Sequence, residues 1–319
     1  MQVENIQVIG VDQGNRNIKT ASSVVPNGIM ESDTIPALAK DILRYNDRYY
    51  ALSYGRQTYT RDKTQGDEFL ALTLMSICRE LRYRGYANDG GPCVAEVILA
   101  LDLPIEHYRV QKEKHKDFFE KRLGNAVCEF DGVLYRIHVR LVDVYPQGFA
   151  ALMSNRELLQ RHDRLCVVDI GGYQVNTVMM KKDSDGESVP VMKYCRTFDM
   201  GIIPLLTEIK RNIDVSFDMK IDDSVVEDIL SGKERYLPEE IRKMAYGIAE
   251  KYVDGILGEL YEAEINLKTT PFLLVGGGSI MLLNWIRQSK RVSISAMFVE
   301  EDIRANARGA EWMSLTRTA

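Results

Sequence analysis

The stretch VDQGNRNIKT, residues 11–20, places a carboxylate, a glycine two residues later and a lysine directly after the apolar run VIGV. The pattern predicts a buried strand, a tight turn and a second strand. A glycine in such a turn lets backbone N–H groups approach a phosphate closely. Asp12 could hold Mg²⁺ through water, and Lys19 could contact a phosphate oxygen. For this turn alone, a plain β-hairpin that happens to contain Asp and Gly remains the better interpretation.

The composition is that of an ordinary globular chain. The 319 residues are 45% hydrophobic and carry a formal net charge of −5, so one large or two smaller domains are expected, without tight contact to nucleic-acid phosphates. The five cysteines and four histidines form no C-x-x-C or H-E-x-x-H pattern, which favours reduced thiols over disulfides or zinc. The polar N-terminus and the lack of any apolar run near ~20 residues predict a cytoplasmic protein without a membrane span.

The opening pattern recurs in the second half of the chain. LCVVDIGG, residues 165–172, is again an apolar run followed by an aspartate and glycines, and a further strand is expected at 175–180. In LVGGGS, residues 274–279, a buried strand breaks into three glycines before a helix, whose N-terminus would favour negative charge. The third turn alone could equally be a packing turn. Three such turns in this order are hard to explain by chance.

Strands and helices alternate between these turns, and residues 26–64 look like a small inserted subdomain. Helices are expected at 67–84, 111–123, 146–159 with Pro146 in the first position, 202–213, 223–230, 238–260, 281–288 and 305–313. Further strands are expected at 94–101, 271–275 and in a hairpin of 126–130 and 133–144. The weak repeat of strand, turn and strand predicts two similar halves.

The three turns together resemble those of the actin/Hsp70/sugar-kinase ATPase superfamily. Within it, the chain is similar to the bacterial actin-like ParM/StbA plasmid-segregation proteins. Residues 11–19 resemble the first phosphate motif, 167–177 the second, 274–282 the adenosine motif, 142–151 and 305–310 the two connecting helices, and 99–108 the end of the inserted ParM subdomain. The resemblance covers nearly the whole chain.

This resemblance implies an α/β, actin-like ATPase fold. It has two related α/β domains, each a mixed five-stranded sheet flanked by helices, with small inserted subdomains and a nucleotide cleft between. Domain I would span 1–155 with an insertion at about 26–66, and domain II 156–319 with an insertion at about 202–268. The implied protein binds ATP or ADP, or alternatively GTP, with Mg²⁺. It hydrolyses ATP, polymerises with itself and segregates plasmid DNA through a separate DNA-binding adaptor, without direct tight nucleic-acid binding or a membrane.

The resemblance also assigns roles to single residues. Asp12 would hold Mg²⁺ through water, Lys19 would contact the β- or γ-phosphate, and Asp169 would orient the metal–water shell as a second, water-mediated metal contact. Gln147, in YPQG, would position the attacking water, although spacing alone equally allows a helix-capping role. The nucleotide would contact the backbone of Gly14, Asn15, Arg16, Gly171, Gly172, Gly276, Gly277 and Gly278. Lys233 and Glu234 are candidates for base contacts, although a solvated charge pair explains them better.

One departure from the family concerns the second turn. ParM-like proteins often carry threonines and then an aspartate after the second glycine, whereas this chain has Tyr173, Gln174 and Asn176. Asparagine cannot act as a base, so a nucleotide-binding regulator without turnover stays open as an alternative. A second alternative is a small-molecule kinase with Asp102 as its base, although the following Leu-Pro favours a structural turn. No substrate domain follows Ala319, which disfavours an Hsp70-like chaperone.

Overall fold

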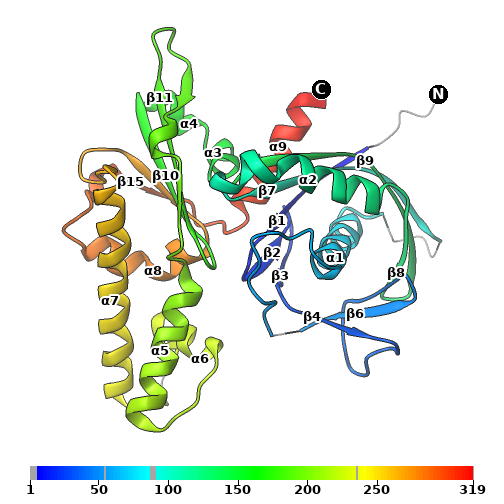
Figure 1. The fold of residues 1–319 in the computed structure, drawn as a ribbon, viewed down its shortest axis with the longest axis horizontal. Coiled ribbons are helices and arrows are strands. Elements are labelled where there is room, and N and C mark those ends of the chain that lie inside the picture. The colour runs from blue at the N-terminus through cyan, green and yellow to red at the C-terminus, as the bar shows by residue number, and fades with distance from the viewer. Residues whose placement is uncertain (1–5, 54, 87–90, 235, 319) are drawn as a thin grey trace. The chain divides into compact units, whose positions relative to one another are not determined.

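The computed structural model describes residues 6–53, 55–86, 91–234 and 236–318, and the chain forms two compact units. The first unit contains Met1–Ser154 and Arg304–Ala319, and the second contains Asn155–Ile303. Both are α/β units in which helices pack on a sheet (Figure 1). Along the described ranges, we find no helix with the length and apolarity that a membrane crossing requires.

The sheet of the first unit is built around the strand that precedes the opening turn. From one edge of the sheet, its first five strands are β3 (Val24–Pro26), β2 (Asn17–Lys19), β1 (Gln7–Gln13), β7 (Cys93–Leu103) and β9 (Val133–Pro146), in that order. The pairings are antiparallel, antiparallel, parallel and parallel. From Val8 to Gln13, every residue of β1 is buried, as expected for a strand covered on both faces.

This sheet has nine strands rather than the expected five. Beyond β9 it continues through β8 (Ala126–Phe130), β5 (Ile42–Tyr45), β6 (Arg48–Leu52) and β4 (Ile29–Ser32). The predicted hairpin of β8 and β9 turns at Asp131 and Gly132, which both have positive φ, and it offers its outer edge to β5. The inserted segment therefore extends the main sheet of this unit.

Three longer helices pack in the first unit. They are α1 (Glu68–Tyr83), α2 (Ile105–Leu123) and α9 (Ala305–Thr318). Helix α9 approaches β1 so closely that a Cβ on Gly10 would lie 2.0 Å from the carbonyl oxygen of Ala307. A Cβ on Gly309 would lie 1.7 Å from the carbonyl oxygen of Ala150. Because of this backbone packing, residues 304–319 belong to the first unit, whereas the expected second domain ran to residue 319.

The predicted helix over 146–159 is wrong at its start and is not continuous. Strand β9 continues through Pro146, which pairs with Leu103, and the Gln147 N–H donates to the Leu103 carbonyl at 2.8 Å. Gly148 then adopts φ +76°, which glycine tolerates without strain. Helix α3 (Phe149–Met153) begins only after this turn, and α4 (Glu157–Arg161) is separate from it. Gly148, rather than Pro146, therefore marks the change from strand to helix.

The second unit repeats the strand pattern of the first. Its sheet contains β12 (Ser188–Pro190), β11 (Val175–Lys182), β10 (Arg164–Ile170), β14 (Phe272–Val275) and β15 (Met297–Val299) in order, with β13 (Arg196–Phe198) also pairing with β11. The pairings are again antiparallel, antiparallel, parallel and parallel. The two halves predicted from the repeated turns are therefore present as two sheets of like topology.

Helices cover the sheet of the second unit and share its core. The longer ones are α5 (Ile202–Phe217), α6 (Asp223–Leu230), α7 (Glu239–Glu262) and α8 (Gly277–Gln288). Helix α7 buries a stripe at helical spacing, from Ile241 through Ala245, Ala249 and Val253 to Leu260. Helix α8 begins directly after β14, so its N-terminus lies at the carboxyl end of a central strand.

Candidate functional site

The opening turn joins β1 to β2 and carries a buried ion pair. Asp12, 2% exposed, and Lys19 are register partners on the two strands. The Lys19 Nζ lies 2.6 Å from Asp12 Oδ2. The structure therefore brings together the carboxylate and the lysine that the sequence singled out.

Gly14 lies where the turn has no room for a side chain. A Cβ there would lie 2.5 Å from the Asn17 carbonyl oxygen and 3.2 Å from Lys19 Nζ. The half-buried residues Asn15 and Arg16 complete the turn. Asn27, which follows β3, also holds this turn in place, and the sequence analysis did not identify it. Its Nδ2 donates to the Gly14 carbonyl at 3.0 Å, and its backbone N–H donates to the Arg16 carbonyl at 2.9 Å. A short turn held this way can present backbone N–H groups to an anion.

Gln147 reaches the same place from the end of β9. Its Nε2 donates to Asp102 Oδ1 at 2.8 Å and, more weakly, to Asp12 Oδ1 at 3.4 Å. Asp102 lies within β7 and is fully buried, so the interpretation of this residue as part of a structural turn is wrong. Burial and the nearby Asp12 carboxylate raise the pKa of Asp102. The sequence marked Asp102 as a candidate kinase base at the end of a buried strand, and the structure places this strand next to β1.

Two further buried residues, Lys63 and His115, contact Gln13 at the end of β1. The ammonium of Lys63 donates to the Gln13 carbonyl, and burial lowers the pKa of this lysine. His115 on α2 contacts Gln13 Oε1 through Nε2 at 2.9 Å, while Gln13 Nε2 donates to Thr73 Oγ1 at 2.7 Å. These residues come from segments far apart in the chain, and no sequence motif marked them.

In the second unit, Asp169 is the penultimate residue of β10 and lies beside two partner strands. It is 4% exposed and pairs in register with Asn176 of β11 and Val275 of β14. The following turn is closed by the Gly171 N–H, which donates to the Gln174 carbonyl at 2.8 Å. The carbonyls of Gly171 and Gly172 accept from the first N–H groups of α5. This second turn thus has the predicted strand–turn–strand form.

The three glycines of the third turn have different surroundings. Gly276 has φ +88°, and a Cβ on it would lie 2.5 Å from Asp169 Oδ1. A Cβ on Gly278 would lie 2.5 Å from Ile170 Cγ2, so this glycine packs directly on β10. Gly277 starts α8, and a Cβ there would meet only Ile303 Cγ2, at 4.0 Å. Gly276 and Gly278 are thus required by packing, whereas Gly277, at the N-terminus of α8, has room for a Cβ.

The residues that depart from the family pattern have structural contacts. Asn176 is 2% exposed, and its Oδ1 accepts from Thr197 Oγ1 at 2.8 Å. Gln174 Nε2 donates to Asp199 Oδ1 at 3.0 Å. Tyr173 packs against the core of the second unit. These contacts tie the second turn to β13 and to the helices behind it.

Lys233 and Glu234 lie in the turn after α6. Lys233 is exposed, and the backbone N–H groups of both residues donate to the Asp228 carbonyl, at 2.8 and 3.1 Å. Glu234 Oε1 accepts from the Leu237 N–H at 2.6 Å and from the Tyr236 N–H. Glu234 therefore shapes the entry to α7, and a base contact by either residue stays a prediction.

Each unit offers one buried carboxylate, Asp12 or Asp169, of the kind that could hold Mg²⁺ through water. Within residues 6–53, 55–86, 91–234 and 236–318, no three His, Cys, Asp or Glu side chains come together as a metal site. Mg²⁺ keeps several of its waters and is commonly bound by one or two carboxylates together with substrate phosphates. Asp12 in the first unit and Asp169 in the second are carboxylates of this kind, each beside a turn without side-chain bulk.

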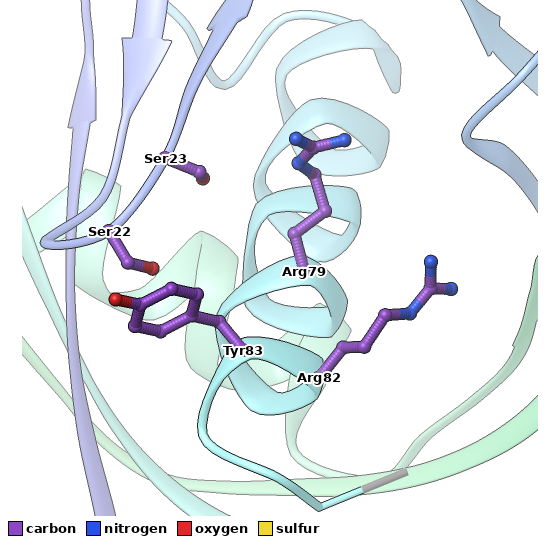
Figure 2. A pocket seen from close by; sticks show the side chains of 5 residues that line it. All are labelled: Ser22, Ser23, Arg79, Arg82 and Tyr83. Atoms are coloured by element: carbon purple, nitrogen blue, oxygen red, sulfur yellow. The ribbon is translucent and has the colours of Figure 1, made fainter. Parts of the chain in front are cut away.

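A pocket of about 260 Å³ in the first unit is lined by other residues: Ser22, Ser23, Arg79, Arg82 and Tyr83 (Figure 2). The two arginines are paired with acids, Arg79 with Asp41 at 2.5 Å and Arg82 with Asp131 at 3.1 Å. None of the residues assigned to nucleotide or metal lines this pocket, and its arginines are already neutralised.

Comparison with known proteins supports the architecture. A family model for the C-terminal region of archaeal MreB-like actin homologues matches residues 167–288. No curated protein matches the chain at a significant level in a sequence search.

Solved structures match over nearly the full length. A ParM from a 15-stranded filament of Clostridium botulinum has 15% identity and a TM-score of 0.78, covering 98% of this chain and 99% of its own. An archaeal actin homologue in complex with ADP has 15% identity and a TM-score of 0.70, covering 97% and 99%. Bacillus thuringiensis ParM with AMPPNP has 16% identity and a TM-score of 0.66, covering 99% and 100%. The resemblance stated from the sequence is confirmed: this chain has the actin-like fold and is similar to ParM proteins and archaeal actin homologues.

Proposed function

We propose that this chain is an actin-like ATPase that binds ATP with Mg²⁺, hydrolyses it and polymerises into filaments. The observation that carries the proposal is the convergence of Asp12, Lys19 and Gln147 at one edge of the first sheet, beside a turn where Gly14 leaves no room for a side chain. Solved relatives of the same fold carry ADP or AMPPNP, or form a filament.

Each side chain has a defined task in this proposal. Lys19 exchanges its contact with Asp12 for a phosphate oxygen, which frees Asp12 to hold metal-bound water. Mg²⁺, when bound, would neutralise charge on the phosphates. Gln147 orients the attacking water, because an amide can accept one hydrogen bond and donate another. In the second unit, Asp169 orients metal-bound water, while the turn at 171–172 and the N-terminus of α8 offer N–H groups to phosphate and ribose.

The test is ATP turnover and ATP affinity in Gln147→Ala. A lost water-positioning group should lower turnover by roughly 10²-fold, whereas calorimetric ATP affinity should change little. Gln160→Ala, which truncates an exposed glutamine on α4, is the matched control and should keep both values. Turnover at the wild-type rate in Gln147→Ala would return Gln147 to a structural role and shift attention to Asp169. A wild-type chain that binds ATP but never hydrolyses it would favour a non-polymerising regulator.

We further propose that the filaments segregate plasmid DNA through a separate, basic adaptor protein. The chain has a formal net charge of −5, and a surface that binds DNA tightly must neutralise several phosphates. Purified protein alone should therefore show no tight binding to plasmid DNA in a salt titration. Tight binding that weakens steeply with added salt would contradict the adaptor proposal.

A further inference from the structure

Asp102 is a buried carboxyl group that the proposed chemistry does not use directly. It is 0% exposed, and its Oδ2 has no hydrogen-bond partner among the described residues. Burying such a group is unfavourable unless its surroundings compensate for the lost water. Its Oδ1 makes one short contact, the 2.8 Å hydrogen bond from Gln147 Nε2. The β7–β9 register fixes this contact, because Asp102 pairs with Tyr145, two residues before Gln147.

This hydrogen bond sets the direction of the Gln147 amide. The nitrogen faces two carboxyl oxygens, Asp102 Oδ1 at 2.8 Å and Asp12 Oδ1 at 3.4 Å. An amide oxygen turned toward two ionised carboxylates would meet only acceptors, whereas the nitrogen can donate to a carboxyl oxygen of Asp102 in either protonation state, so the nitrogen is the atom that fits there. With the nitrogen held, the amide oxygen points to the opposite side. Only the Asp102 contact has good hydrogen-bond length, so Asp102 contributes most of this preference.

Buried charge of the opposite sign accompanies Asp102. The Lys63 ammonium, 4% exposed, is anchored on the Gln13 carbonyl. Lys63 and Lys19 act to lower the pKa of Asp102, against the larger effects of burial and of Asp12. Whether Asp102 is charged or neutral, one of its oxygens remains an acceptor for the Gln147 amide.

We propose that Asp102 is a positioning residue, which holds the Gln147 amide so that its oxygen accepts a hydrogen bond from the attacking water. The inference rests on the proposed ATP hydrolysis. Asp102 touches neither nucleotide nor water in this scheme and acts only through Gln147. Removing it leaves the amide free to rotate by half a turn and present its nitrogen instead.

The experiment is a double-mutant cycle of Asp102→Leu and Gln147→Ala, read as kcat for ATP and as calorimetric ATP affinity. Asp102→Leu removes the acceptor oxygens and leaves an uncharged side chain of similar size. It should lower kcat about 10-fold, less than the loss expected from removing the Gln147 amide itself, and should leave ATP affinity unchanged. In the Gln147→Ala background the same substitution should have no further effect, because coupled residues are non-additive. Asp102→Asn keeps an acceptor oxygen and should recover most of the rate. Thermal melting of each variant verifies folding, and Asp102→Ala takes the place of Asp102→Leu in the cycle where the leucine variant does not fold.

The outcomes separate the inference from the proposed function. Wild-type protein without ATP turnover refutes the proposed function, and the inference falls with it. Turnover in the wild type combined with an Asp102→Leu effect of equal size in both backgrounds refutes the inference alone. A wild-type kcat in Asp102→Leu, or an Asp102→Asn variant as slow as Asp102→Leu, also refutes it.

Discussion

At the residue scale, a chain of hydrogen bonds fixes the side chains behind the first turn. Thr73 Oγ1 donates to the Phe69 carbonyl, so it must accept from Gln13 Nε2. Gln13 Oε1 then has to accept from His115 Nε2–H at 2.9 Å. Burial, and secondarily the Lys63 ammonium, lowers the pKa of His115 to about 3. The imidazole is therefore neutral at physiological pH and serves as a hydrogen-bond donor.

This neutral histidine predicts a loss of stability in mild acid. The unfolded chain binds a proton on His115 below about pH 6.5, whereas the folded chain does so only near pH 3. The contribution of His115 to the free energy of unfolding is therefore complete above the pKa that His115 has in the unfolded chain. It falls by about 1.4 kcal/mol per pH unit as the pH decreases toward the pKa that His115 has in the folded chain. Between pH 7 and pH 5 we expect about 2 kcal/mol of loss from this group.

Urea unfolding of the wild type and of His115→Gln at both pH values measures the effect. Glutamine can place an amide N–H near the position of Nε2 but does not titrate. Other groups titrate in both proteins, so the difference between the two pH dependences isolates His115. An identical loss of stability in the two proteins would show that His115 does not carry the effect.

At the element scale, the strand–turn–strand units follow from local sequence. Apolar runs, aspartates and glycines near 11–20 and 165–180 produced the predicted turns, and the alternating hairpin at Asp131-Gly132 formed as expected. The start of the helix after residue 146 was mispredicted, because strand pairing with Leu103 continues through Pro146. Local signals therefore identify elements whose ends are set by turn residues, and they fail where a neighbouring strand decides the boundary.

The surroundings of the first turn could not be predicted in the same way. Lys63 contacts Gln13 from 50 residues away, and His115 does so from 102 residues away. Neither follows a motif, because only the tertiary fold brings α2, which packs on β9 and β7, and the segment before α1 close to the end of β1. Asp102, near the carboxyl end of β7, is the exception among the residues around this turn. A polar residue at the end of a buried strand can be recognised in the sequence itself.

Helix α8 allows a test of nucleotide contact that separates ligand binding from folding. A Cβ at Gly277 would make only an ordinary van der Waals contact, with Ile303 Cγ2 at 4.0 Å, so Gly277→Val should fold like the wild type. If α8 receives a phosphate or ribose at its N-terminus, the same substitution should weaken ATP binding by at least about 10-fold, or about 1.4 kcal/mol. Calorimetry with ATP and Mg²⁺ gives the affinity.

Two further glycines provide the controls for this measurement. Gly247 lies within α7, and a Cβ there meets nothing within 4 Å, so Gly247→Val should keep wild-type affinity. Gly276→Val should instead fail to fold, because its φ of +88° and the 2.5 Å approach to Asp169 exclude a side chain. Unchanged ATP affinity in a folded Gly277→Val protein would remove α8 from the proposed nucleotide site.

At the scale of the whole molecule, the two sheets share the same order of strand pairings. In each sheet, a strand with an aspartate near its end is followed by a glycine-containing turn and an antiparallel strand. Each unit therefore brings its own acidic residue and its own set of backbone N–H groups. ATP and ADP differ in the γ-phosphate, the group that the water held by Gln147 would attack in the proposed scheme. A ligand shifts a conformational or assembly equilibrium only through contacts that differ between the two states. Any dependence of assembly on nucleotide must therefore arise from contacts to this phosphate.

Assembly should accordingly follow the state of the nucleotide. We expect filaments in negative-stain microscopy and light scattering with ATP or a non-hydrolysable ATP analogue, and shortening as ATP is consumed. The Gln147→Ala variant should bind ATP and assemble, but its filaments should outlive those of the wild type, because the γ-phosphate is retained. Gln160→Ala filaments, as the matched control, should shorten at the wild-type rate. Filaments of equal stability with ADP and with the analogue would uncouple assembly from hydrolysis, while leaving the actin-like fold untouched.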